Sequence, residues 1–238
     1  MKITLPKSIV SQVLAPALKL WLRTQVEEIK GLQISISGSN RQILEGYIPR
    51  VSLTCDHAIY QGLQLNKTEL EGENIRINIG QVIKGKSLEL LEPVLVKGEA
   101  SLREQDLQAS LSANLLSTAL KDLLLAFIST NQKQSKRNLW NDKQINWDEI
   151  KIDAGKLTLT GSIRGVKARE MPISLRSGLN LVSPHELSLS PIFIEAPELG
   201  GISIHNYKID LGQQVYLEKL NIAPGKIFCR GSLTVVVS

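Results

Sequence analysis

Three histidines and two cysteines are the residues in this chain best suited to catalysis or metal binding. His57, His185 and His205 lie far apart in the sequence, and no two of them have a spacing typical of metal ligands. Cys55 and Cys229 do not form a Cys-x-x-Cys pair. We therefore expect no metal, no cofactor and no catalytic centre built on these side chains.

Motifs for nucleophilic or phosphate-binding sites give no stronger indication. The segment from Gly161 to Gly165 has the wrong spacing for the Gly-x-Ser-x-Gly elbow of a hydrolase, and no phosphate cradle is predicted. Asp56 and His57 are adjacent, but neighbouring residues on a strand point to opposite faces. The sequence predicts a protein that is not an enzyme. A lipid-processing hydrolase is a third hypothesis, which requires a Ser or Asp beside a histidine at a cavity mouth.

The charge balance is modestly basic, with 28 basic and 23 acidic side chains and a net charge of +5. Aromatic residues make up only 4% of the chain, and its basic residues alternate with acidic ones. A nucleic-acid-binding surface needs clustered basic residues with aromatic side chains for stacking, so we expect no nucleic-acid partner. An anionic membrane surface is compatible with this charge.

One segment concentrates basic charge around a tryptophan, in a polar linker predicted over residues 130–144. Basic residues near an anionic leaflet contribute about 1 kcal/mol each, and Trp favours the headgroup layer. A solvated loop whose tryptophan packs back on the domain is the alternative. The predicted membrane-contact residues are Lys133, Lys136, Arg137, Trp140 and Lys143.

The elements that position these residues begin with a helix predicted over residues 6–30, where apolar side chains recur at helical spacing. Pro16 predicts a kink or a helix restart just before it, and Gly31 is expected to end the helix. Over residues 32–100 the period changes to two, which predicts antiparallel strands with one apolar face. Cys55 shares that face, so we expect it to be a buried free thiol.

A second long helix is predicted over residues 102–129, with Ser101 and Glu104 forming a capping box at its start. Such a helix would be roughly 40 Å long, so the fold should be elongated. Strands return over residues 145–238, with Cys229 on the apolar face of the final one. This order of elements predicts an α+β fold in one domain spanning residues 1–238.

No run of the roughly 18 to 20 apolar residues needed for a membrane-spanning helix is present. Charges are scattered through the first 25 residues instead of preceding one apolar run, so no signal peptide is predicted. We expect a cytoplasmic or peripheral membrane location. The oligomeric state cannot be predicted from these residues.

The aliphatic surface of the helices and strands supports two readings. It forms either an ordinary filled core or the wall of a slot for an acyl chain, and periodicity alone does not separate them. Under the second reading, the predicted lining residues come from both helices and from the strands. They are Val13, Leu14, Leu18, Leu22, Ile34, Ile36, Leu53, Ile75, Ile77, Leu116, Leu120, Leu124 and Phe127.

Several segments resemble the LmeA-like phospholipid-binding family, and its cyanobacterial branch in particular. The resemblance covers roughly residues 25 to 236 and rests on spread Gly, Leu and Ile positions. The segments are Gly31-Leu32, 46–51, 58–63, 73–77, 102–107, 211–220, 224–226 and 229–231. It implies an elongated tubular lipid-binding (TULIP-like) fold, in which a highly twisted antiparallel sheet wraps long helices around an apolar channel. It also implies phospholipid binding without a catalytic motif.

The resulting hypothesis is a non-enzymatic protein that binds, and also transfers, phospholipid or another acyl lipid at a membrane surface. The alternative is a structural or adaptor domain with a closed core that binds a protein partner. A continuous interior cavity would reject the alternative, and a filled interior would favour it.

Overall fold

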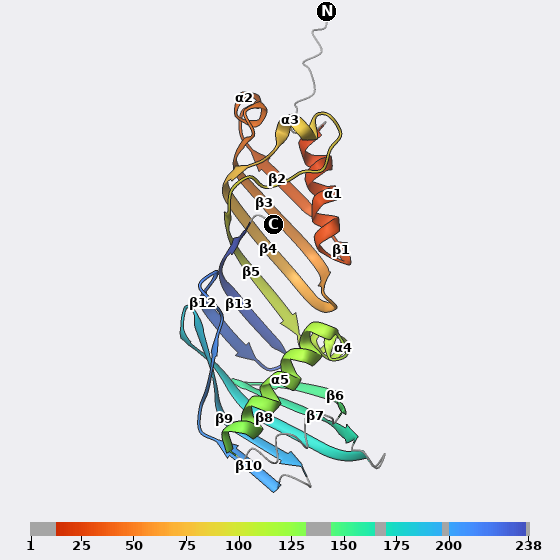
Figure 1. Ribbon diagram of the computed structural model, residues 1–238, viewed down its shortest axis with the longest axis vertical. Helices are drawn as coiled ribbons and strands as arrows, with labels where there is room; N and C mark the ends of the chain where they lie inside the picture. The colour runs from red at the N-terminus through yellow and green to blue at the C-terminus, as the bar shows by residue number, and fades with distance from the viewer. Residues whose placement is uncertain (1–12, 132–143, 165–169, 197–199, 237–238) are drawn as a thin grey trace, which may run out of the picture.

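The strands of this chain form two antiparallel sheets, as seen in the computed structural model, which describes residues 13–131, 144–164, 170–196 and 200–236. The molecule is elongated, with the first sheet and the second sheet arranged end to end (Figure 1). An antiparallel α+β fold is therefore confirmed.

Sheet 1 has the order β1-β3-β4-β5-β13-β12, with β2 also pairing with β3. Its strands are β1 (Glu28–Lys30), β2 (Gln33–Ser37), β3 (Tyr47–Tyr60), β4 (Leu63–Arg76), β5 (Val94–Arg103), β12 (Val215–Ala223) and β13 (Lys226–Val235). The pairing of β5 with β13 joins two parts of the chain that are far apart in sequence.

Sheet 2 has the order β10-β9-β8-β7-β6, with β11 also pairing with β9. Its strands are β6 (Gln144–Asp153), β7 (Lys156–Arg164), β8 (Glu170–Ser183), β9 (Glu186–Ala196), β10 (Gly200–Ile204) and β11 (Tyr207–Asp210).

Five described helices accompany the sheets: α1 (Ala15–Gln25), α2 (Asn40–Leu44), α3 (Ile79–Val82), α4 (Glu104–Ser110) and α5 (Asn114–Asn131). Helix α1 packs beside sheet 1, and α5 runs along sheet 2 (Figure 1). The predicted arrangement of long helices wrapped by the sheet is not what the structure shows.

The first predicted helix is shorter than expected. Of its range 6–30, residues 6–12 lie outside the described residues, and α1 ends at Gln25 because Val26 is already extended. Residues 28–30 form β1, which pairs with β3. Pro16 lies in the first turn of α1, where proline is tolerated, and Val13 and Leu14 before it are already helical, so the predicted kink or helix restart stays a prediction. Gly31 instead occupies a turn at φ +64°, where a Cβ would collide with Asp56.

The predicted helix over residues 102–129 is divided. Strand β5 continues through Arg103, α4 follows, and a break at residues 111–113 precedes α5. The predicted capping box is wrong, because Ser101 lies in β5 and its Oγ donates to the Asn66 carbonyl at 3.1 Å. Gly62 lies against this break, since a Cβ there would be 2.6 Å from Cβ of Ala113. The turn between β3 and β4 therefore packs closely against the chain between the two helices.

Candidate functional site

Sheet 1 has one apolar face on β5, β12 and β13, produced by alternation that a bulge in β12 shifts by one residue. Residues directly opposite one another on paired strands lie on the same face. On these three strands the face consists of Val94, Val96, Gly98, Ala100, Leu102, Val215, Leu217, Leu220, Ile222, Ile227, Cys229, Gly231, Leu233 and Val235. The position predicted for Cys229 is thus confirmed.

Packed cores cover this face at its two ends. At one end, Val94 and Val96 belong to the core beneath α1, with Leu14 fully buried in it. At the other end, Leu102 and Ile227 pack against the core beneath α5. Sheet 1 therefore contributes side chains to both cores.

Between the cores lies a set of apolar residues that we call the central strip. Its members are partly or largely exposed and belong to neither core cluster. They are Leu70, Gly98, Ala100, Val215, Leu217, Leu220, Cys229, Gly231 and Leu233. Leu233 is 44% exposed. No described helix overlies the middle of β5 and β13, between α1 and α4 (Figure 1).

Two glycines in the middle of the central strip let neighbouring groups pack directly on the backbone. Gly98 accommodates Leu70, whose Cδ2 lies 2.4 Å from the place where a Cβ of residue 98 would be. Gly231 lies opposite a bulge in β12, where a Cβ would be 2.2 Å from the carbonyl oxygen of Tyr216. Leu70 therefore packs over Gly98, and the β12 backbone packs against Gly231, so a larger side chain at either position would displace a neighbour.

One buried hydroxyl lies in the row next to Ala100. Thr68 is opposite Cys55 on one side and Ala100 on the other. Its Oγ1 is buried and has no hydrogen-bond partner among the described residues. Cys55 is a buried free thiol, as predicted, and burial raises the pKa of its thiol group. Apart from Thr68, the row from Cys55 to Leu220 is apolar.

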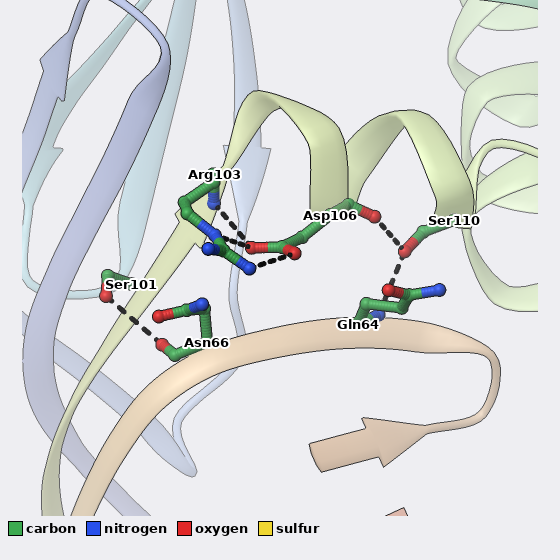
Figure 2. Close-up of polar contacts among 6 residues, drawn as sticks. All are labelled: Gln64, Asn66, Ser101, Arg103, Asp106 and Ser110. Atoms are coloured by element: carbon green, nitrogen blue, oxygen red, sulfur yellow. Dashed lines mark hydrogen bonds and ion pairs between the residues drawn. The ribbon is translucent and has the colours of Figure 1, made fainter. Parts of the chain in front are cut away.

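Helix α4 follows β5 directly, and polar contacts link it to the ends of β5 and β4 (Figure 2). Asp106, only 3% exposed, accepts hydrogen bonds from the backbone N–H of Arg103 at 3.1 Å and from its Nε at 2.9 Å. Burial raises the pKa of this carboxyl group, but the Arg103 bonds and charge hold it below its ordinary value. Ser110 Oγ donates to the Asp106 carbonyl at 2.6 Å and accepts from the Gln64 amide at 2.9 Å.

The same helix joins the two sheets. Gln108 Nε2 donates to the Asp148 carbonyl at 2.6 Å, and its Oε1 accepts from the Ile150 amide at 2.9 Å. Glu104 accepts from the Ile152 amide at 2.7 Å. These groups lie on the free edge of β6, so α4 side chains occupy the place of a neighbouring strand.

The predicted lining residues divide between the two cores and do not form one wall. The first group packs in the core beneath α1: Val13, Leu14, Leu18, Leu22, Ile34, Ile36, Ile75 and Ile77. The second group packs in the core beneath α5: Leu116, Leu120, Leu124 and Phe127. Leu53 is buried and lies in the same row as Leu70 and Gly98. Contact of these residues with a ligand stays a prediction.

The predicted membrane-contact residues Lys133, Lys136, Arg137, Trp140 and Lys143 lie outside the described residues. Among the histidines, His185 Nδ1 is 2.5 Å from the Val215 carbonyl oxygen, and no hydrogen bond to a Ser or Asp side chain is found for any histidine within the described part of the chain. Likewise, no group of potential metal ligands is found among the described residues.

A match to the nucleotide-binding P-loop pattern, Gly-x4-Gly-Lys-Ser, occurs at residues 80–87, where the sequence analysis predicts no phosphate cradle. A P-loop lies between a strand and a following helix, whereas here the short α3 comes first. The backbone N–H groups of Lys84, Gly85 and Lys86 donate to carbonyl groups of Gln81 and Val82. They are therefore not available to cradle a phosphate.

An open pocket of about 770 Å³ lies between the β3–β4 turn and the start of α5. Its charged lining residues are Glu27 and Asp122, and Glu27 accepts a hydrogen bond from the Gly62 amide at 2.9 Å. Two carboxylates disfavour an anionic headgroup. The central strip is therefore the better candidate for a lipid-contacting site.

Sequence reasoning missed most of the central strip. The alternation in β5 and β13 was available as a signal, but Gly98, Ala100 and Gly231 weaken it because they contribute little hydrophobicity. Their shared face follows from strand register between distant segments, which periodicity does not provide.

Comparison with known proteins gives one match. A family model described as LmeA-like phospholipid-binding matches residues 6–232, nearly the whole chain. The search of curated proteins and the search of solved structures each gave no match. None of the described helices is long and apolar enough to cross a membrane.

Proposed function

Because the chain belongs to the LmeA-like phospholipid-binding family, we propose that it binds a phospholipid without catalysis, with an acyl chain lying along the central strip. The observation that carries this proposal is the apolar face of sheet 1 that neither core covers. Contiguous exposed apolar surface marks binding sites, and each buried methylene group contributes about 0.8 kcal/mol.

The dimensions of the central strip support an acyl ligand. Val96 packs in one core and Leu102 packs against the other, and six residue steps along β5 separate them. At about 3.3 Å per residue, this interval is roughly 20 Å long. One leaflet contributes about half of the ~30 Å hydrocarbon thickness of a bilayer, so an acyl chain fits this length.

Some of the predicted lining residues can contact an acyl chain without any opening of the packed cores. Leu14, Leu124 and Phe127 have no exposed surface, so a ligand reaches them only if a core opens. Leu22 and Leu116 are partly exposed at the margins of the cores. We place the acyl chain on the central strip first, with such marginal side chains beside it.

In addition to binding, we propose that the protein transfers phospholipid between membranes. A ligand on an open sheet face is released without opening a packed core, which favours exchange. The net charge of +5 supports an anionic membrane surface as the donor or acceptor.

The test compares two substitutions on β5. Ala100→Phe fills the central strip, whereas Leu95→Phe alters the opposite, exposed face of the same strand. Loss of contact with two or three methylene groups amounts to about 2 kcal/mol, so A100F should bind phospholipid about 30-fold more weakly. Native mass spectrometry of protein purified from cells, followed by titration with phospholipid, measures this.

L95F should retain the lipid of the unmodified protein. If the unmodified protein carries and binds no phospholipid, or if A100F binds as tightly as L95F, the proposal fails. The adaptor function with a closed core is the second candidate, favoured by complete burial of Leu14, Leu124 and Phe127. Absence of bound lipid together with capture of a specific protein would support it.

A further inference from the structure

Helices α2 and α3 lie together at the end of sheet 1 that is away from sheet 2 (Figure 1). We call this end the tip, comprising residues 39–46 and 77–91. The two helical segments are linked where the Ile77 amide donates to the Gly46 carbonyl at 2.9 Å.

Three large apolar side chains project from the tip into solvent. Leu44 is 51% exposed, Ile83 is 51% exposed and Leu91 is 57% exposed. Their neighbours Ile43 and Val82 are buried in the core beneath α1. The exposed side chains are thus held outward by residues packed inward.

Local hydrogen bonds fix this arrangement. Ser39 caps α2, since its Oγ accepts from the Gln42 amide and its own amide donates to Gln42 Oε1 at 2.9 Å. Asn78 closes the loop after α3, with Nδ2 donating to the Ser87 carbonyl at 3.0 Å and Oδ1 accepting from the Glu89 amide at 2.9 Å. The tip presents a pre-ordered surface, which lowers the entropic cost of binding.

Unpaired basic charge lies beside the apolar residues. Lys84 directly follows Ile83, and Lys86 comes two residues later; both are exposed and make no ion pair within the described part of the chain. A hollow of about 390 Å³ between the two helical segments has Leu44 and Lys84 in its lining. Arg41 pairs with Glu45 at 3.1 Å, and Glu89 is the other acidic residue of the tip, so three basic against two acidic side chains leave it a net charge of +1.

We propose that the tip docks on a phospholipid bilayer, with Leu44 and Ile83 entering the interface and Lys84 and Lys86 contacting lipid phosphates. This inference rests on the proposed function and adds the surface through which it operates. Apolar side chains among lysines suit a membrane interface, where each lysine strengthens binding about fivefold. Three projecting side chains are few for a stable protein interface, which buries about 800 Å² on each partner.

The tip and the central strip lie along the same face of sheet 1, with the core beneath α1 between them. Val94 on β5 belongs to that core, Val96 packs against it, and Gly98 lies in the central strip. Docking through the tip therefore brings the central strip near a membrane, and a lipid that enters at the tip reaches the strip only past the edge of this core.

The experiment measures co-sedimentation with vesicles of phosphatidylcholine and a minor fraction of phosphatidylglycerol. Leu44→Asp combined with Ile83→Asp should weaken vesicle binding about tenfold or more, because both side chains lose apolar insertion. Lys84→Glu with Lys86→Glu should weaken it on these vesicles and less on pure phosphatidylcholine. The matched control, Leu95→Asp with Val182→Asp, changes two equally exposed residues elsewhere and should bind like the unmodified protein.

Unchanged binding by both tip variants, or no vesicle binding by the unmodified protein, overturns the inference. So does loss of binding in Trp140→Ser with the tip variants unaffected, which would assign the contact to residues 133–143. A dimer of the unmodified protein that dissociates in the tip variants would identify a second copy as the occupant instead. Native mass spectrometry separates the two proposals, because a lipid-free protein that still docks through the tip refutes only the central strip.

Discussion

At the scale of single residues, Asp106 is the most deeply buried charged group among the described residues. Asp106, in the first turn of α4, is bonded to Arg103 at the end of β5. Two guanidinium nitrogens and the backbone amide of Arg103 donate to its carboxylate. The carboxylate also lies near the positive end of α4, where negative charge is favoured. Its ionised form is therefore part of the folded structure.

This carboxylate predicts a pH dependence of stability. Its folded-state pKa lies below the ordinary value, so its contribution is complete above the unfolded-state pKa of about 3.9 and is lost as pH falls through the folded-state pKa. Asp106→Asn should lower the free energy of unfolding by about 1 to 2 kcal/mol at pH 7. Urea denaturation from about pH 3 to about pH 7 should show a smaller acid-induced loss of unfolding free energy in the variant.

The exposed Asp122 on α5 provides the comparison. Asp122→Asn should change the free energy of unfolding by less than about 0.5 kcal/mol at any pH. Equal effects of the two substitutions would contradict the role assigned to Asp106.

At the scale of elements, α4 replaces a strand at the edge of β6. Gln108→Ala removes the bonds to the Asp148 carbonyl and the Ile150 amide. The substitution should cost about 1 to 2 kcal/mol and accelerate hydrogen exchange at the Ile150 amide. Exchange measured residue by residue checks this result.

The control for this substitution is on the same helix. Ala109 is exposed on α4, so Ala109→Gln should leave both stability and exchange at β6 unchanged. Unaltered protection of Ile150 in Gln108→Ala would show that the side chain does not hold the β6 edge.

How far the sequence predicts the elements depends on the range of the interactions that form them. The period-two pattern correctly predicts antiparallel strands. The pattern after residue 102 also correctly predicts helix, but it does not reveal that β13 holds Leu102 and Arg103 in β5. Ser101 shows the same limit, because its buried bond to Asn66 depends on the pairing of β4 with β5. The short α2 and α3 contain too few turns for a periodic signal.

For the candidate site, too, local sequence patterns predict some residues and long-range strand pairing determines the others. Residues with large side chains, such as Leu14 and Phe127, are predicted as apolar and are found buried. The central strip depends on Gly98 and Gly231 facing each other across β5 and β13, which only tertiary register determines.

At the scale of the whole molecule, the two cores share sheet 1. Leu102, Ile222 and Ile227 come from sheet 1 but pack against the core beneath α5. The bonds from Glu104 and Gln108 add a polar connection between the sheets. We therefore propose that the chain behaves as a single cooperative domain.

Substitutions in the two cores test this cooperativity. Leu14→Ala and Phe127→Ala each create a cavity at a fully buried position, and each should cost about 3 to 5 kcal/mol. Trp21 packs against one core and Trp147 against the other, so their fluorescence reports on each separately. Both reporters should show one common midpoint, lowered by either substitution.

Distinct midpoints for Trp21 and Trp147, with each substitution affecting only its own core, would contradict this expectation. The chain would then consist of two independently folding halves. Variants in which Trp140 and one of these two tryptophans are replaced keep the signals apart.

The pairing of β5 with β13 also affects how the protein folds during synthesis. Val94 pairs with Val235, so one edge of β5 has no partner until the ribosome has completed residues 226–235. The residues of sheet 2 are all synthesised in this interval, during which this edge of β5 stays unpaired. Such long-range pairing is slow and exposes the nascent chain to aggregation, so chaperones are expected to protect β5 during translation.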